Sequence, residues 1–193
     1  MKSWISGAVE GSVDEAVLRR LCHDAGLEVR LIKVCGGKAK LDRKLGAYNA
    51  AAQHGRWIVI RDLNSDADCG PALVAKLLPN PSKQMHFRIA KRSVEAWLLA
   101  DRKGFSQFFS TPLARIPLQP ELLEHPKKAV LQIVRRSRKR AIREDMIPRE
   151  GSGAKEGPAY SSRLAEFAQT IWQPEHAAET SDSLRRCLLR LGA

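Results

Sequence analysis

The chain has 193 residues, of which 44% are hydrophobic and 28% charged, a composition typical of a globular protein with one main core. Its 33 Lys and Arg against 21 Asp and Glu give a formal net charge of +12, which favours a polyanionic partner, nucleic acid first. No apolar stretch approaches the roughly 20 residues of a membrane span and no signal-peptide pattern is present, so we expect a cytoplasmic protein without a membrane partner.

Cysteine and histidine spacing gives no metal or disulfide motif. The four cysteines are widely separated, form no Cys-x-x-Cys pair and mostly adjoin apolar residues. We therefore expect reduced thiols that pack in the protein interior. None of the five histidines pairs with a cysteine at the spacing of a structural zinc site.

Strand and helix patterns alternate through the first 101 residues. Apolar runs predict strands over 4–9, 27–34, 57–61 and 85–90, with a helical pattern after each. Such alternation is typical of parallel strands joined by crossover helices. We expect an α/β fold with a parallel sheet of about four strands flanked by helices.

The first two helices have simple sequence signals. Ser12 is the expected N-cap of the first, and Gly26 its end. The second follows Gly36, Gly37 and Lys38, with Leu41, Leu45, Tyr48 and Ala52 at helical spacing. The Gly-Gly-Lys turn lacks the spacing of a P-loop, which excludes that type of ATP site.

Acidic side chains follow the first and third predicted strands. Glu10 follows the first strand, and Asp14 falls in the next helical turn. The third strand leads into a row of oxygen-bearing side chains: Asp62, Asn64, Asp66 and Asp68. Carboxyl ends of parallel strands gather ligands, and oxygen donors suit Mg²⁺, so these residues are candidate metal ligands. The spacing does not fit an EF-hand.

Local backbone chemistry is the alternative for each acid. Asp- and Asn-rich turns bond nearby backbone groups, and acids in a first helical turn complement the helix dipole. The same alternative applies to Glu95, which lies just after the expected cap Ser93 in an otherwise apolar helix over 94–101. A functional role for Glu95 requires that this helix begin beside Glu10 and Asp62.

Beyond residue 101, prolines break the chain into short pieces before a basic segment. We expect one helix over 127–143 whose charges form a phosphate-binding surface. Its candidate contacts are Arg135, Arg136, Arg138, Lys139, Arg140 and Arg143. No aromatic residue is interleaved, so base stacking is not indicated, and a solvated helix face is the alternative.

The C-terminal part is expected to be mostly helical. A flexible loop over 149–158 precedes two predicted closing helices that start at Tyr160. We divide the chain into an α/β core, residues 1–104, and a helical extension with the basic segment, residues 105–193, packed on that core.

The placement of the acids resembles the TOPRIM domain of topoisomerases, bacterial primases and OLD-type nucleases. Val9 to Asp14 is similar to the glutamate element after that family's first strand, and Asp62-Leu63-Asn64 stands where its Asp-x-Asp element belongs. The stretch 88–101 resembles more closely the small stand-alone TOPRIM-like proteins of bacterial defence and mobile-element loci. Asn64 replaces the second aspartate and removes one negative ligand.

This resemblance implies a Rossmann-like TOPRIM-type fold and a nuclease dependent on Mg²⁺ or Mn²⁺, with DNA favoured over RNA and an ATPase as partner. Glu10, Asp14 and Asp62 would ligate the metal, and either Asp66 or Asp68 would compensate for Asn64 or metal binding would be weakened. Glu95 would complete the site or act as base. The residues expected to hold phosphate are Lys38, Arg88 and Lys91.

Three functions stay open at this point. The first is hydrolysis, favoured over covalent strand transfer because no tyrosine lies near the acids in sequence. The second is a non-catalytic nucleic-acid-binding subunit, and the third is a toxin or regulator that acts through a partner ATPase. The sequence does not decide the oligomeric state.

Overall fold

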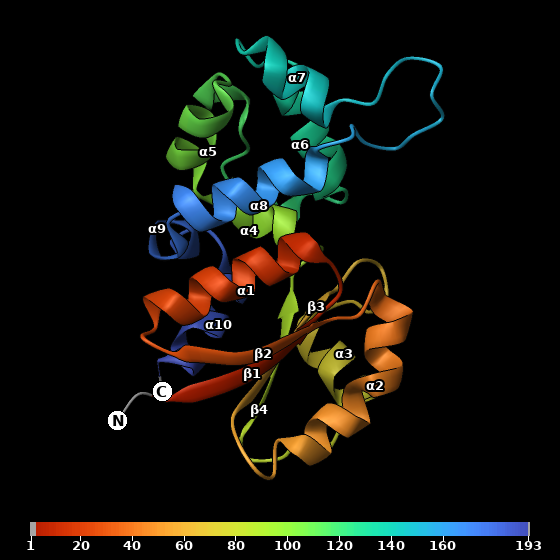
Figure 1. Cartoon of the computed structure of the whole chain (residues 1–193), viewed down its shortest axis with the longest axis vertical. Coiled ribbons are helices and arrows are strands. Elements are labelled where there is room, and N and C mark those ends of the chain that lie inside the picture. Colours follow the sequence, from red (N-terminus) through yellow and green to blue (C-terminus); the bar gives the residue numbers. More distant parts are fainter. Residues whose placement is uncertain (1–2, 193) are drawn as a thin grey trace.

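The computed structural model describes residues 3–192 and contains a sheet of four parallel strands (Figure 1). The strand order is β2-β1-β3-β4, so the chain starts in the interior of the sheet and adds strands on both sides. The strands are β1 (Trp4–Val9), β2 (Glu28–Val34), β3 (Trp57–Asp62) and β4 (Met85–Ala90). The expected α/β class and the parallel sheet are therefore confirmed.

Ten α-helices and two short 3-10 helices make up the other elements of residues 3–192. Four α-helices follow the strands in turn: α1 (Ser12–Asp24), α2 (Lys38–Ala51), α3 (Gly70–Leu77) and α4 (Val94–Ala100). The rest of the chain contains α5 (Arg102–Phe109), η1 (Leu113–Arg115), η2 (Pro120–Leu122), α6 (Pro126–Val134), α7 (Arg140–Met146), α8 (Tyr160–Thr170), α9 (Pro174–Ala178) and α10 (Asp182–Leu191).

Alternation along β3 creates two cores, one on each face of the sheet. Ile58 and Ile60 belong to the cluster beneath α1, α4 and the C-terminal helices, whereas Val59 points into a smaller cluster with α2 and α3. Apolar residues are thus needed at successive positions of β3, as expected for a parallel strand covered on both faces. Helical spacing of Leu41, Leu45 and Tyr48 supplies the facing side of α2.

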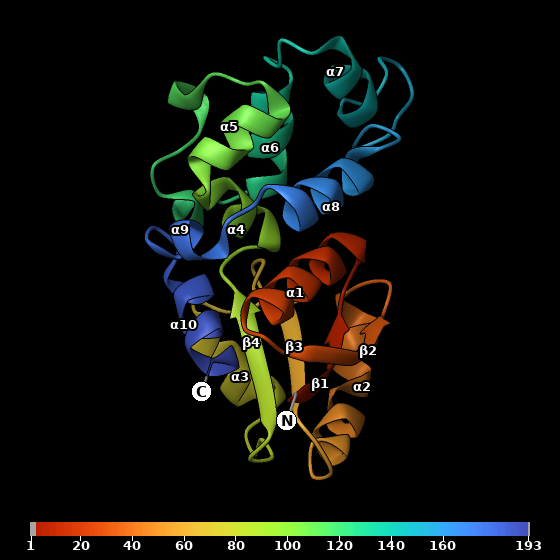
Figure 2. The ribbon, with the colours of Figure 1, turned by 60° about the vertical axis from the view of Figure 1, so that its left-hand side comes forward.

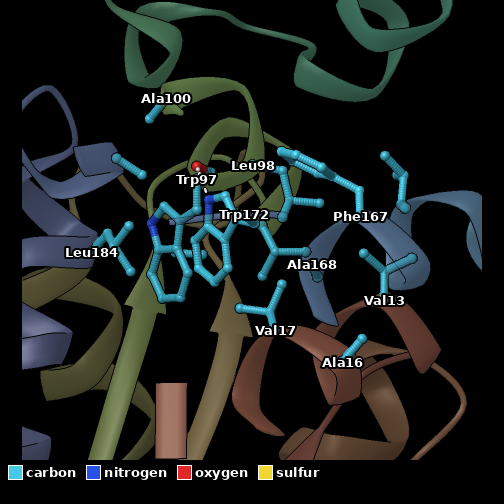
Figure 3. Packing of buried hydrophobic residues seen from close by; sticks show 14 of the residues in the cluster. Val13, Ala16, Val17, Trp97, Leu98, Ala100, Phe167, Ala168, Trp172 and Leu184 are labelled. Carbon is cyan, nitrogen blue, oxygen red and sulfur yellow. Dashed lines mark hydrogen bonds between the residues drawn. The ribbon is translucent and has the colours of Figure 1, made fainter. Parts of the chain in front are cut away.

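The larger core joins the sheet to the C-terminal helices. Trp97 of α4 and Trp172, just after α8, lie beside one another with Val17 of α1 and Phe167 of α8 (Figure 3). The Trp172 Nε1–H donates to the Trp97 carbonyl at 3.2 Å, which satisfies a polar group that burial would otherwise leave unpaired. The two predicted parts of the chain share this cluster, and their division at residue 104 stays a prediction.

Two C-terminal predictions were wrong in detail. The helix expected over 127–143 is interrupted between α6 and α7, because the Ser137 hydroxyl donates to the Phe109 carbonyl at 2.6 Å. Arg138 N also donates to the Ser110 carbonyl, so this turn is fixed against the end of α5. The two closing helices are three, since α9 intervenes, and α10 packs beside β4 (Figure 2).

Gly157, in the loop before α8, approaches the end of α7 too closely for a side chain. A Cβ at this position would meet the Asp145 carbonyl oxygen at 2.5 Å and Met146 backbone carbon at 2.5 Å. Since these are backbone atoms, they cannot move aside as a flexible side chain would. Gly157 therefore fixes where α8 begins.

Gly157→Ala is expected to destabilise the protein by about 1–3 kcal/mol, the usual cost of overpacking. Gly46→Ala is the matched control, because Gly46 is exposed within α2 and its Cβ would meet nothing within 4 Å. The control should gain up to about 1 kcal/mol from higher helix propensity. Denaturant unfolding midpoints measure both, and equal midpoints for the two variants would contradict the close approach.

Candidate functional site

A pocket of about 330 Å³ lies at the carboxyl edge of the sheet, where β1 and β3 end and α1 and α4 begin. Four acidic residues predicted from sequence line it: Glu10, Asp14, Asp62 and Glu95. Its other side comes from the C-terminal part of the chain, since Tyr160 and Ser161 open α8, which runs alongside α1 (Figure 1). The condition set for a functional Glu95 is met, because α4 begins beside Glu10 and Asp62.

Asp62 links three elements at this edge. Its backbone N–H donates to Glu10 Oε1 at 2.9 Å, and its own Oδ1 accepts from the Val94 N–H at the start of α4 at 3.1 Å. Parallel pairing between β1 and β3 brings their ends together and makes the first contact possible. Asp62 thus performs the capping role expected of Ser93, whose hydroxyl is buried without a hydrogen-bond partner among residues 3–192.

Asp14 occupies the first turn of α1 and points back to the strand end. Its Oδ2 accepts from the Gly11 N–H at 2.7 Å, and Gly11, not the expected Ser12, is the N-cap residue. This bond satisfies one of the amides that the helix start leaves free. Asp14 is only 7% exposed, so its carboxylate is largely removed from bulk water and depends on backbone hydrogen bonds of this kind.

Glu95 is held from the opposite side of the pocket. It is also 7% exposed, and the Tyr160 hydroxyl donates to its Oε1 at 3.4 Å. Both residues are buried, so this weak contact joins α4 to α8 in the interior. Glu95 is therefore not a solvated residue that merely complements the dipole of its own helix.

The charges of these acids are not neutralised by basic neighbours. Within residues 3–192, no basic side chain forms an ion pair with Asp14, Asp62 or Glu95, while Glu10 lies 3.7 Å from Arg61 Nε. A carboxylate that caps a helix usually has a lowered pKa. In this pocket the pKa values of Glu10, Asp14 and Asp62 are raised instead.

Burial is the main cause of raised pKa values in the pocket. It raises the pKa of Asp14 to about 7, and the charges of Glu95 and Glu10 add to the effect against the hydrogen bond from Gly11. Burial and the surrounding carboxylates also raise the pKa of Asp62 well above its ordinary value. The pKa of Glu10 is raised by burial, although the Asp62 amide and Arg61 oppose this.

The acids have the ligand chemistry that a hard cation prefers, but their oxygens are not already arranged around one point. Oxygen donors that are buried and mutually repulsive favour Mg²⁺ or Mn²⁺. As they stand, no three Asp, Glu, His or Cys side chains in residues 3–192 are grouped as metal ligands. Joint ligation therefore requires the carboxylates to turn toward a common point.

Arg61 organises a second charged cluster on the α2 side of the sheet. It is only 3% exposed and pairs with Asp66 at 2.6 Å and Asp42 at 3.0 Å. Lys38 adds a further contact to Asp66 at 2.8 Å. Burial alone would raise the pKa of Asp66, but its hydrogen bonds with Lys38 and Arg61 lower it.

The oxygen-bearing side chains of the acidic loop therefore do not all reach the pocket. Asp66 is engaged by Arg61, Lys38 is engaged by Asp66, and Asp68 is exposed. Asn64 adopts a left-handed conformation with φ of 50°, and its carbonyl accepts from Arg92 at 2.8 Å. None of these four predicted site residues lines the pocket, so neither Asp66 nor Asp68 contributes a carboxylate there in place of Asn64.

Two predicted phosphate-binding residues also lie elsewhere. Arg88 faces α10 from β4, where burial lowers its pKa beside Cys187 and Arg190. Lys91 follows β4, and its backbone N–H donates to the Ser183 hydroxyl at 3.1 Å. Neither residue lines the acidic pocket.

The basic residues gather around the interrupted segment between α6 and α7. Arg135, Arg136, Arg138, Lys139 and Arg140 are exposed, and Arg143 is half-buried. Arg140 is paired with Glu144 at 2.7 Å, and the Arg143 guanidinium donates to the Ser137 carbonyl. The positive surface is thus a turn with both helix ends rather than one helix face.

Sequence reasoning missed two residues of the pocket. Tyr160 and Lys127 both line it, and the Lys127 Nζ lies 5.0 Å from the centre of the Tyr160 ring while pairing with Glu156 at 2.6 Å. The expectation that no tyrosine is near the acids holds along the chain but not in space. No local sequence pattern indicates that either residue lies near the acids. Tyr160 reaches the pocket only because α8 packs on α1.

Comparisons with protein-family models, curated proteins and solved structures give no match. In the part of the chain that the structure describes, no helix has the length and apolar character needed to cross a membrane.

The raised pKa of Asp14 predicts a pH-dependent stability in metal-free protein. A carboxyl that binds its proton more tightly when folded contributes stability below its unfolded pKa, and that contribution is lost as pH rises through about 7. Asp14→Asn keeps an acceptor for the Gly11 amide but removes the charge. At about pH 8 the variant should be more stable than the parent, by on the order of 1–4 kcal/mol.

Denaturant unfolding in EDTA, from about pH 5 to about pH 8, measures this difference. Asp68→Asn is the control, because Asp68 is exposed and outside the pocket. The Asp14→Asn and parent curves should diverge as pH rises. Curves that stay parallel would show that the Asp14 carboxylate is not held at an energetic cost.

Proposed function

We propose that the protein is a metal-dependent phosphodiester hydrolase acting on nucleic acid, with DNA favoured over RNA. The observation that carries this proposal is the convergence of four acids in one pocket, three of them without an ion-pair partner among residues 3–192. Such a cluster is costly unless a cation occupies it. The resemblance of the acid pattern to TOPRIM nucleases agrees with this chemistry.

Glu10, Asp14 and Asp62 would hold Mg²⁺ or Mn²⁺. A bound divalent ion supplies a polarised phosphate oxygen and an activated water. The chain itself positions these groups, since Asp62 joins the ends of β1 and β3 to the start of α4. Glycines at the pocket wall, Gly36 and Gly37, leave space beside the acids.

Glu95 and Lys127 would act on the attacking water and the substrate phosphate rather than ligate the metal ion. Glu95, which lines the pocket and accepts a hydrogen bond from Tyr160, would accept a proton from the attacking water. Lys127 is the basic residue of the pocket lining and is half-exposed, so its ammonium group can meet a phosphate oxygen. Its pairing with Glu156 would then be exchanged for one with the substrate.

A non-catalytic nucleic-acid-binding or regulatory subunit, working with an ATPase, is the second candidate. The observation that favours it is that neither Asp66 nor Asp68 contributes a carboxylate to the pocket in place of Asn64. Asp66 is instead engaged by Arg61. In this case the acids would bind a cation or a partner without cleaving substrate. Assays for binding and for cleavage must therefore be performed side by side.

We expect labelled DNA to be cleaved in Mg²⁺ or Mn²⁺ and not in EDTA. Glu95→Gln should reduce the rate by about 10²–10⁴-fold, the usual contribution of a general base. Asp62→Asn should abolish cleavage but keep the fold, because the amide oxygen can still accept from the Val94 N–H. Gel assays on single- and double-stranded DNA and RNA measure cleavage.

Asp68→Asn is the matched control, with the same chemical change in the exposed loop. It should leave cleavage unchanged. Asn64→Asp should not raise the rate either, because residue 64 lies outside the pocket lining. Metal binding by calorimetry without cleavage of any substrate, with or without an added ATPase, would favour the regulatory subunit and contradict hydrolysis.

A further inference from the structure

A second cavity, of about 570 Å³, is lined in part by residues of α6, the helix in the upper part of Figure 1. Three arginines line it: Arg135 and Arg136 follow α6, and Arg115 ends η1. Two separate segments of the chain thus place guanidinium groups around one space. We call it the arginine cavity.

The three guanidinium groups lack anionic partners in the protein. Arg115, Arg135 and Arg136 are exposed, and none forms an ion pair within residues 3–192. By contrast, Arg140 is paired with Glu144. Like charges around one cavity repel one another, and a bound anion would remove that cost.

Apolar side chains also line the arginine cavity. They belong to Pro117, Leu123, Ala129 and Ile133, and Gln132 adds a neutral polar group. Guanidinium groups bind phosphate through paired N–H donors, whereas a sugar or base face packs on apolar side chains. This combination suits a phosphate with an attached nucleoside better than it suits a bare inorganic anion.

Helix α6 connects this cavity to the acidic pocket. Lys127, in its first turn, lines the acidic pocket, and Arg135 follows its last residue. At about 1.5 Å per residue the two positions are separated by about 12 Å along the helix. On a duplex whose axis runs along α6, that distance is the axial rise of about three to four nucleotides of one strand, at about 3.4 Å each.

We propose that the arginine cavity binds a nucleotide phosphate of the same strand whose reacting bond occupies the acidic pocket, about three to four nucleotides away. This inference rests on the proposed function for the identity of the strand. Binding in the cavity does not itself require cleavage. The cavity would fix the register of the substrate relative to the acids.

The test compares two double variants that each remove two positive charges. Arg135→Ala/Arg136→Ala changes the cavity, whereas Arg43→Ala/Lys44→Ala removes two exposed charges from α2, on the other face of the sheet. Fluorescence anisotropy of a labelled DNA duplex in EDTA measures binding over a range of salt. The cavity variant should lower the magnitude of the slope of log K against log salt by about 0.9, the contribution of the one phosphate that the cavity holds, and Arg115→Ala should lower it by at most about the same amount.

The control variant should leave that slope unchanged. An equal loss in both double variants would overturn the cavity in favour of diffuse attraction. No loss in either would also overturn it and point to another occupant, such as an acidic protein. A cavity-specific loss with no cleavage of any DNA would support the binding site and contradict only the hydrolase.

Discussion

The hydrogen bonds of Asp62 are the interaction on which the rest of the site depends. They join β1, β3 and α4 at one point, because the Asp62 amide donates to Glu10 and the Asp62 carboxylate accepts from Val94. A carboxylate used only as a cap would be expected to keep a low pKa. Burial, together with the charges of Asp14, Glu95 and Glu10, instead raises the pKa of Asp62, so a residue that orders the site also lies among buried acids.

The charge of the protein is divided between distinct surfaces. Its net charge is +12, yet four acids line the pocket at the sheet edge, and Arg61 pairs with Asp66 of the neighbouring loop. Unpaired arginines lie beyond, around the arginine cavity. A polyanion attracted by the positive surface would still need a cation to approach the acids. The proposed metal and the proposed nucleic-acid substrate therefore depend on each other.

Local sequence patterns predicted most of the strands and helices. The features that these patterns did not predict depend on tertiary packing. Strand alternation and the Asp62 position were sufficient to bring Glu10 and Asp62 to one edge. The approach of Tyr160 could not be predicted, because it depends on α8 packing along α1 far away in sequence. The interrupted helix had a similar cause, since Ser137 bonds to Phe109 of α5. Arg61 had a signal that was overlooked: it shares a face with Val59 and therefore points toward α2 and the acidic loop.

The central claim is that the acidic pocket is a cation site. Its most direct test is the shift in melting temperature that Mg²⁺ produces at different pH values. Because the pKa of Asp14 is about 7 and that of Asp62 is raised, protons should compete with the cation. The account predicts a clear rise in melting temperature with Mg²⁺ at about pH 8 that vanishes at about pH 5, and no rise at either pH in Asp62→Asn. A Mg²⁺ effect that is absent at the higher pH, or that persists in Asp62→Asn, would contradict it.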